Sequence, residues 1–201
     1  MKLYYLPGAC SLASRIALLE AGCKFDSAVV DRKNRTTSDG LKLEQVNSKG
    51  YVPALRLDDG QILTENVAVL LYIADRNPGA HLAPPADAFE RYRMIEWLAF
   101  INSEIHKGYS PLFNPAVSEE AKQHTRNALA KRLDWVNEAL GARNFLLGES
   151  FTVADAYLFT VLRWSGRVGI DLARWPNLER YYAAIGARAP VVAALRAEGL
   201  A

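Results

Sequence analysis

The chain has 201 residues, of which 50% are hydrophobic, and its 24 basic and 22 acidic side chains leave a formal net charge of +2. This length and composition suit one large soluble domain or two modest ones. The balanced charge argues against nucleic-acid binding, and no apolar run approaches the ~18 residues of a membrane-spanning helix.

The first eleven residues predict a short strand, a turn and the start of a helix. Residues 3–6 favour a strand, Pro7 and Gly8 interrupt it, and apolar side chains recur at helical spacing from Ser11 onward. We therefore expect Cys10 at the N-terminus of this helix, where free N–H groups and the helix dipole lower the pKa of a thiol. The alternative is that Cys10 is a small buried hydrophobe, as most lone cysteines are.

The second cysteine, Cys23, follows the same predicted helix. If residues 11–22 are helical, the two cysteines lie about 18–20 Å apart, which is too far for a disulfide. The sequence around Cys10 has no CxxC motif, so a dithiol oxidoreductase is disfavoured. Because the Pro-Gly turn also cuts the first apolar segment too short for a signal peptide, we expect a cytoplasmic protein.

Strands and helices alternate in the pattern up to about residue 78. We expect a second strand over residues 25–30, an exposed loop over 31–40, a short helix near 41–46, and a hairpin formed by residues 53–57 and 61–63. Thr64 is expected to cap the next helix, with Glu65 in its first turn. This order predicts a sheet with helices packed over its faces.

The second half of the chain follows a Pro- and Gly-rich segment over residues 77–85, which has the composition of a linker. Beyond it every pattern is helical: residues 87–107 with an end at Gly108, residues 119–140 after Ser118 with an end at Gly141, a helix from the capping box of Thr152 and Asp155 to Trp164, and two shorter helices after Pro176 and Pro190. We predict an α/β domain over residues 1–80 and an all-α domain over residues 86–201.

Five stretches, in this order along the chain, resemble the cytosolic glutathione S-transferases and, within them, the bacterial beta class. They are residues 1–13, 50–55, 63–66, 106–109 and 151–159. The resemblance covers the whole chain and implies a thioredoxin-like N-terminal domain, an all-α C-terminal domain and glutathione as co-substrate. Together with long helices that are apolar beyond the needs of one face, it also predicts a symmetric homodimer. No residue spacing indicates a metal site.

The resemblance implies that Cys10, with Ala9 beside it, lies next to the glutathione sulfur and is able to form a mixed disulfide with it. Pro53 would be a cis-proline that leaves the backbone of Val52 free to pair with the cysteinyl backbone of glutathione. From the residues alone, Pro53 could equally be a proline at the start of a strand.

Further glutathione contacts are implied near the ends of the peptide. Glu65 would pair with the glutathione ammonium, although most glutamates in a first turn only complement the dipole. Asn66 stands where the class usually has serine. Arg35 would bind the glycyl carboxylate, and Lys33 is the other cation available there.

In the C-terminal half, Ser103, Glu104 and His106 match the class pattern and would reach glutathione, whereas Ala99 replaces a frequent asparagine. His106 would be catalytic together with Cys10, because an imidazole donates to a thiolate or takes the proton of a thiol. A set of aromatic residues could line the electrophile site, although aromatic stripes are more often ordinary core: Tyr109, Phe113, Tyr157 and Trp164.

The function implied is glutathione conjugation, a transfer of alkyl or aryl groups from small hydrophobic electrophiles to the glutathione sulfur. Within the same class, thiol transfer or reductive dehalogenation through Cys10 is the alternative reaction. From a different class, the chain could be a non-catalytic interaction protein with this fold. Retention of Cys10, Glu65 and His106 together weighs against that last reading.

Overall fold

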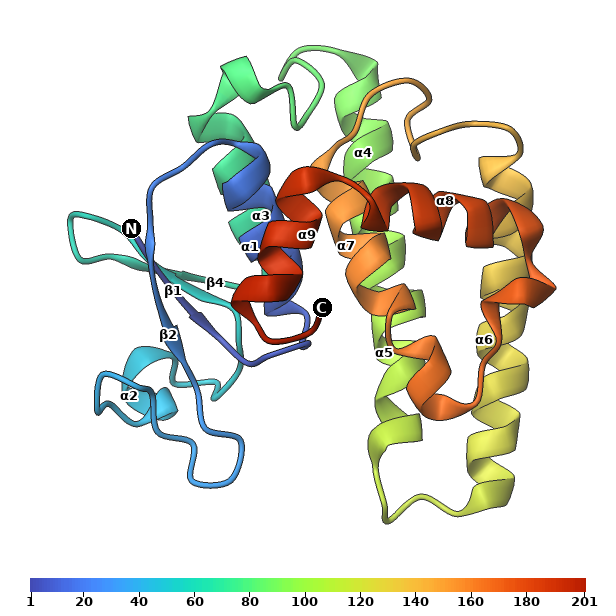
Figure 1. Ribbon diagram of the computed structural model, residues 1–201, viewed down its shortest axis with the longest axis horizontal. Helices are drawn as coiled ribbons and strands as arrows, with labels where there is room; N and C mark the ends of the chain where they lie inside the picture. Colours follow the sequence, from blue (N-terminus) through green and yellow to red (C-terminus); the bar gives the residue numbers. More distant parts are fainter. The chain divides into compact units, whose positions relative to one another are not determined.

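The computed structural model describes residues 1–201, and contacts divide the chain into two compact units, seen in Figure 1. Unit 1 contains Met1–Ala83 together with Arg188–Ala201, and unit 2 contains Pro84–Ala187. Residues 188–201, which the sequence pattern assigns to the C-terminal domain, belong to the first unit by their contacts. The reason is that the last helix, α9 (Ala189–Ala197), packs along α1 (Ser11–Glu20).

Unit 1 is built on a four-stranded mixed sheet in the order β2-β1-β3-β4. Its strands are β1 (Lys2–Tyr5), β2 (Asp26–Val29), β3 (Ala54–Arg56) and β4 (Ile62–Thr64). The central strand β1 runs parallel to β2 and antiparallel to β3, so that Leu3 lies opposite Ser27 and Leu55. The predicted strands, hairpin and strand-helix alternation are confirmed.

Both faces of this sheet are covered, as the period-two side-chain pattern requires. On one face Tyr4, Ala28 and Ala54 pack with Val46 of the short helix α2 (Leu43–Val46). Leu3 and Leu55 are fully buried on the opposite face, where α1 and α3 (Asn66–Arg76) pack against one another (Figure 1). A short 3-10 turn, η1 (Pro78–Ala80), follows α3.

The start of α3 differs from the sequence prediction. Thr64 is the last residue of β4, where it pairs with Ala54, and therefore it does not cap the helix. Glu65 occupies the N-cap position instead, with a positive φ of 71°. The chain passes from the strand into the helix through this single residue, which is why it adopts a left-handed backbone that is unusual outside glycine.

Helix α9 is fastened to α1 at both ends by ion pairs. Glu198, buried just after α9, accepts hydrogen bonds from Arg15 Nε at 3.0 Å and from the Gly8 N–H at 2.9 Å. At the other end, Arg188 donates to both carboxylate oxygens of Glu20 at 2.6 and 2.8 Å. The C-terminal segment thus holds the turn that precedes α1.

The regular elements of unit 2 are helices, joined by turns and loops. Its first helix, α4 (Phe89–Phe100), continues without interruption as the π-helical segment η2 (Ile101–His106), α5 (Lys107–Tyr109) and the 3-10 turn η3 (Ser110–Phe113). The remaining elements are α6 (Glu119–Leu140), α7 (Val153–Leu162), η4 (Ser165–Val168), η5 (Leu172–Arg174) and α8 (Pro176–Gly186). None of these helices, nor any in unit 1, combines the length and apolar character needed to cross a membrane.

The predicted helix end at Gly108 is wrong, because Gly108 lies inside the continuous helical run. A Cβ at this position would lie 3.1 Å from the side chain of Leu129 on α6. Glycine is therefore present to allow close approach of two helices rather than to stop one.

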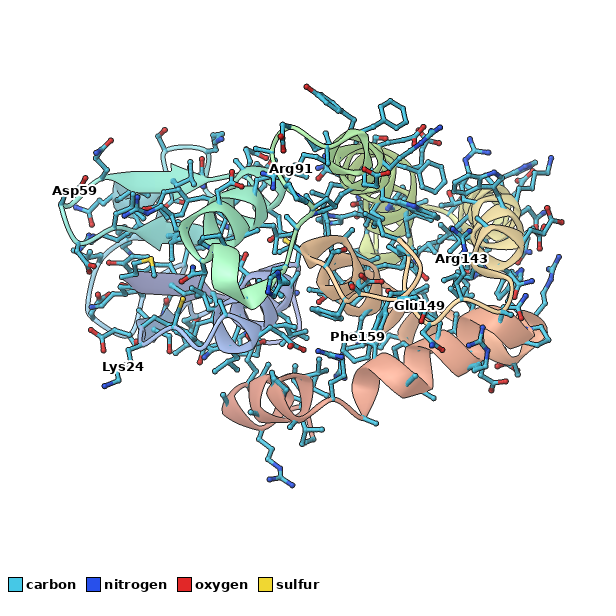
Figure 2. All side chains as sticks on the ribbon, turned by 90° about the horizontal axis from the view of Figure 1, so that it is seen from above. Lys24, Asp59, Arg91, Arg143, Glu149 and Phe159 are labelled. Carbon is cyan, nitrogen blue, oxygen red and sulfur yellow. The ribbon has the colours of Figure 1, made fainter.

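Helix α7 forms the centre of unit 2, and every one of its residues is buried. Its predicted capping box is confirmed: Asp155 Oδ2 accepts hydrogen bonds from the N–H and the hydroxyl of Thr152 at 2.8 and 2.9 Å. The helix ends at Leu162, two residues before the predicted end at Trp164. Phe159, labelled in Figure 2, stacks on Tyr182 of α8 with ring centroids 5.1 Å apart.

Candidate functional site

The turn between β1 and α1 places Cys10 at the N-cap position of α1, as the sequence predicts. Gly8 adopts a positive φ of 69°, and the Ala9 N–H closes the turn on the Leu6 carbonyl at 3.0 Å. Cys10 and Cys23 are not joined by a disulfide, as predicted. The helix N-terminus therefore presents a partly buried thiol.

A second segment of unit 1 lies against this thiol. Cys10 Sγ donates a hydrogen bond to the Val52 carbonyl oxygen at 3.3 Å, and the Val52–Pro53 peptide bond is cis. The fold thus brings Ala9, Cys10, Val52 and Pro53 together, although they lie more than forty positions apart in the chain. The contact joins the thiol to the backbone that leads into β3.

The N-terminus of α3 carries the next two predicted residues, and they point in different directions. Glu65 is 64% exposed at its side chain, and its carboxylate accepts a bond from Lys49 Nζ at 2.5 Å. Asn66 is buried, and its Oδ1 accepts a bond from Ser14 of α1 at 2.8 Å. Its Nδ2 is buried without a hydrogen-bond partner. Asn66 thus joins α3 to α1, whereas Glu65 faces outward.

Arg35 connects the loop over residues 31–40 to α2 and to the segment at Gly50. It donates from Nε to Glu44 at 2.7 Å and from Nη2 to the Gly50 carbonyl at 2.7 Å. The hydrogen bond from Arg35 Nε holds the pKa of the Glu44 carboxyl below its ordinary value. Arg35 therefore positions the segment that leads to Val52, while the side chain of Lys33 is exposed on the same loop. The choice between the two cations stays a prediction.

In unit 2, three of the predicted residues lie on the π-helical segment η2. Ser103 is exposed, and Glu104 pairs with Arg132 of α6 at 2.9 Å. His106 is the last residue of the segment. π-helical turns are rare and concentrate at functional sites, so this segment favours a functional role for Ser103, Glu104 and His106.

His106 is held in an aromatic environment. Its ring lies edge-on to Trp164 with centroids 4.9 Å apart, and its Nδ1 lies 2.6 Å from the hydroxyl of Tyr157. Burial, with a smaller effect of neighbouring Lys107, lowers the pKa of His106 to about 4. The imidazole is therefore neutral near pH 7.

The aromatic residues predicted for the electrophile site gather around Trp164. Tyr109 and Phe113 contact it edge-on at 5.7 and 6.0 Å between centroids. Tyr109 is fully buried, and burial raises its pKa to about 12, while Phe113 is 43% exposed. Tyr157 is fully buried as well. The structure thus groups these residues with His106, and Phe113 is the most exposed of them.

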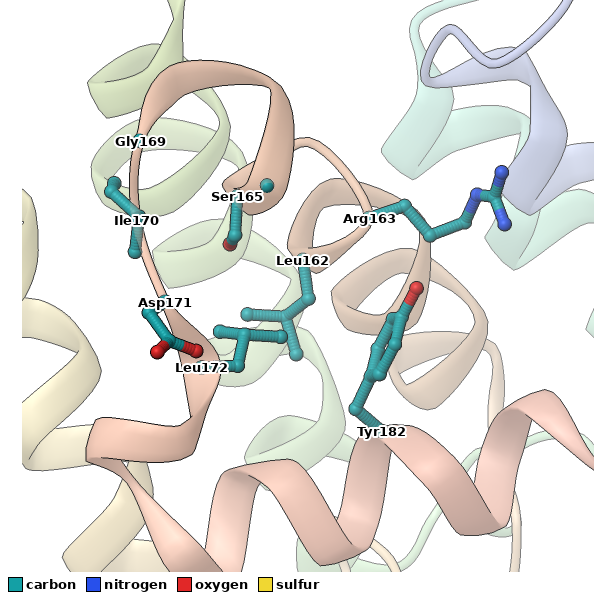
Figure 3. Close-up of a pocket in the computed structure, with 9 residues that line it drawn as sticks. Leu162, Arg163, Ser165, Gly169, Ile170, Asp171, Leu172 and Tyr182 are labelled. Atoms are coloured by element: carbon teal, nitrogen blue, oxygen red, sulfur yellow. The ribbon is translucent and has the colours of Figure 1, made fainter.

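A hollow of about 570 Å³ lies beside this cluster, between the segment that follows α7 and helix α8 (Figure 3). Leu162, Ser165, Asp171 and Tyr182 are among its lining residues, and the four predicted aromatic residues are not. Ser165 links the two regions, because its hydroxyl lies 2.5 Å from that of Tyr109. Sequence reasoning missed this hollow since its lining comes from short turns without a periodic pattern.

Sequence reasoning also missed Lys49, Asn102 and Arg132, which pair with predicted site residues across long separations in the chain. No local signal marks them, because each pair forms only when distant elements pack. No group of three or more His, Cys, Asp or Glu side chains is arranged to hold a metal ion.

A mixed sheet that presents a cysteine at its first helix, combined with a unit of packed helices, is the architecture of the glutathione S-transferases. Residues 8–76 match the N-terminal domain of that family and residues 100–189 match its C-terminal domain. The chain belongs to the glutathione S-transferase family.

Comparison with individual relatives indicates which class of glutathione S-transferase the chain resembles. The chain is 47% identical to glutathione S-transferase GstA of Escherichia coli O157:H7, over the full length of both. It shares 48% identity and a TM-score of 0.96 with the structure of a sphingomonad glutathione S-transferase complexed with glutathione, again over both full chains. The bacterial beta-class enzyme of Sphingomonas chungbukensis gives the same two values and the same coverage. These comparisons support the beta-class resemblance.

Proposed function

We propose that this chain is a glutathione transferase that binds glutathione on unit 1 and activates its thiol for transfer to small hydrophobic electrophiles. The observation that carries the proposal is the contact of Cys10 Sγ with the Val52 carbonyl at 3.3 Å. It brings a thiol at the N-terminus of a helix next to the backbone of Val52, which suits a small thiol peptide. The relative whose structure is described as complexed with glutathione supports the same ligand.

Each polar end of glutathione has a matching group in unit 1. The free N–H groups at the start of α3 suit the γ-glutamyl carboxylate, and the exposed Glu65 carboxylate suits the ammonium beside it. Arg35 or Lys33 would take the glycyl carboxylate. Binding would require Glu65 to exchange Lys49 for the ligand.

The reaction follows from the thiol. The glutathione S–H loses its proton, the sulfur lone pair forms a bond to the electrophilic carbon, and the leaving group departs with its bonding electrons. His106 is the candidate acceptor of the proton, with Ser103 and Glu104 on the same segment as further glutathione contacts. Phe113 would provide exposed apolar surface for the electrophile, with Trp164 packed against it and Tyr109 packed against Trp164.

Thiol transfer or dehalogenation through Cys10 is the second candidate reaction, and the position of this thiol at the N-terminus of α1 favours it over the alternative of a non-catalytic interaction protein. In that case the protein sulfur itself attacks a disulfide or resolves a mixed one. Cys23 offers no substitute, since it lies beyond the other end of α1 and bonds to Asn77.

We expect Glu65→Gln to weaken glutathione binding by about 1–3 kcal/mol, because a neutral amide loses the charge-assisted bond to the ammonium. Isothermal calorimetry measures the affinity. Lys49→Met serves as the control, since it frees the Glu65 carboxylate from its ion pair and should not weaken binding. An unchanged affinity in Glu65→Gln would reduce Glu65 to a partner of the helix dipole.

Two further variants separate conjugation from thiol transfer. In a conjugation assay, Cys10→Ala should keep substantial activity, because the nucleophile is the glutathione sulfur. His106→Ala should lose roughly ten- to a hundredfold, the effect of losing one hydrogen bond to a charged group. A glutathione-dependent disulfide-reduction assay should show the reverse order if Cys10 is the nucleophile. Loss of both activities in Cys10→Ala, with His106→Ala barely affected, would contradict the conjugation mechanism.

The homodimer belongs to the same proposal. Phe89 and Tyr92 on α4 are 64% and 63% exposed, and a second copy of the chain would remove such apolar rings from water. Light scattering that gives the mass of a single chain across the micromolar range would argue against it.

A further inference from the structure

Three side chains of unit 2 form a hydrogen-bonded row that ends at His106. The His106 Nδ1 atom lies 2.6 Å from the Tyr157 hydroxyl, and the same hydroxyl donates to Asn102 Oδ1 at 3.0 Å. Asn102 and His106 both come from the π-helical segment η2, and Tyr157 comes from α7. The tyrosine is fully buried, so its hydroxyl is set between these two groups.

The row determines where the proton of the imidazole lies. A phenol hydroxyl carries one hydrogen, and an amide oxygen is only an acceptor. Since that hydrogen is donated to Asn102 Oδ1, the short contact with His106 requires the hydrogen to come from Nδ1. A neutral imidazole has a single N–H, so Nε2 then carries a free lone pair.

We propose that Asn102 and Tyr157 are positioning residues that hold His106 as its Nδ1–H tautomer, so that Nε2 is a proton acceptor toward the substrate thiol. This inference rests on the proposed function for its substrate. It decides between the two roles that an imidazole can have here: His106 accepts from the S–H group, and it is able to donate to the sulfur only after it has taken the proton. The thiol proton thus moves to Nε2, and the electron pair of the S–H bond stays on sulfur.

The surroundings of His106 keep it in this neutral form. Its ring is packed against Trp164 and Tyr157, and burial lowers its pKa to about 4. The charged neighbour is Lys107, whose positive charge also disfavours the imidazolium. Near pH 7 the imidazole of His106 is therefore neutral, and its two tautomers differ in which ring nitrogen carries the hydrogen. The contact with the Tyr157 hydroxyl determines that nitrogen.

The experiment is a long-range ¹H–¹⁵N NMR spectrum of the full chain without glutathione, in which protonated and unprotonated ring nitrogens have widely separated shifts. The chain has three histidines, and the His106 signals are identified by their loss in His106→Gln. We expect Nδ1 protonated and Nε2 unprotonated in the unchanged protein. A protonated Nε2 would overturn the proposal, and it would mean that the Asn102 amide donates to Tyr157 instead.

Three variants test the row. Tyr157→Phe removes the acceptor of the Nδ1–H and should shift His106 toward the Nε2–H tautomer, with a roughly five- to tenfold fall in kcat for conjugation and little change in the KM for glutathione. Asn102→Asp keeps an acceptor and should keep the tautomer. Tyr181→Phe is the matched control, because it deletes a buried hydroxyl that bonds to Asp155 and not to His106, and its spectrum should match the unchanged protein.

The outcomes are distinct from those of the proposed function. Retention of the Nδ1–H tautomer in Tyr157→Phe overturns the positioning role whatever the activity. A loss of that tautomer in Asn102→Asp, which keeps an acceptor for the Tyr157 hydroxyl, overturns the positioning role of Asn102. Failure of the proposed function would appear instead as absent glutathione binding in calorimetry of the unchanged protein, and the ligand-free spectrum does not depend on it.

Discussion

Replacing Asp155 by alanine is expected to lower the free energy of unfolding by about 3–5 kcal/mol, measured by urea denaturation. The buried carboxylate accepts hydrogen bonds from the N–H and hydroxyl of Thr152, from the Leu146 N–H at 2.8 Å and from the Tyr181 hydroxyl at 3.0 Å. Burial raises the pKa of Asp155 to about 6, so the low-dielectric surroundings do not themselves favour its charge. The cost arises because the donors are left buried without an acceptor.

Asp171→Ala is the matched control, because this exposed carboxylate accepts a single bond, from the Ala173 N–H at 3.0 Å. We expect it to cost about 1 kcal/mol or less. Asp155→Asn should fall between the two, since an amide keeps one acceptor oxygen. Equal losses in Asp155→Ala and Asp171→Ala would show that the capping box of α7 contributes little.

Glu198→Ala is expected to cost a similar 3–5 kcal/mol, although it lies in the other unit. The change leaves the Arg15 guanidinium charged and buried, and it removes the acceptor of the Gly8 N–H. Part of that guanidinium, the Nη2 atom, already lacks a partner. Urea denaturation measures the loss, and Glu96→Ala, which breaks an exposed pair with Arg93, should cost less than about 1 kcal/mol.

A double variant separates the free energy that the Arg15–Glu198 ion pair contributes from the cost of leaving one partner buried and unpaired. Arg15→Met with Glu198→Leu replaces two buried charges by apolar side chains of similar volume, and such exchanges are often neutral or stabilising. We expect it to recover most of the stability that Glu198→Ala loses. If the double variant is as unstable as the single one, the ion pair itself stabilises the contact of α9 with α1.

Patterns confined to a few neighbouring residues were predicted correctly. The spacing of Thr152 and Asp155 is a local signal, since the capping box closes within one turn of helix, and the structure confirms it. The same is true of Cys10, whose position depends only on a strand, a turn and a helix that follow one another. Such features need no knowledge of the tertiary fold.

Features that depend on packing were missed or mistaken. Glu65 is the N-cap of α3 because the pairing of β4 with β3 extends to Thr64, and nothing near Thr64 in the sequence shows that pairing. Gly108 has the appearance of a helix end, but its role is set by Leu129, which is distant in the chain.

The candidate site follows the same rule. The residues expected to meet glutathione could be named from short motifs, whereas their partners could not. Asn66 bonds to Ser14, and His106 to Tyr157, only after separate helices have packed. The direction in which a side chain donates or accepts, which decides what it does chemically, is settled by those distant partners.

The bond between the Gly8 N–H and Glu198 spans 190 positions of the chain. At typical rates of synthesis of about 5–20 residues per second, Glu198 is made roughly 10–40 s after Gly8. While all of unit 2 is translated, the turn that presents Cys10 therefore lacks its hydrogen bond to Glu198. Unit 1 is discontinuous along the chain, and the turn that presents Cys10 gains its full set of hydrogen bonds only after Glu198 has been synthesised.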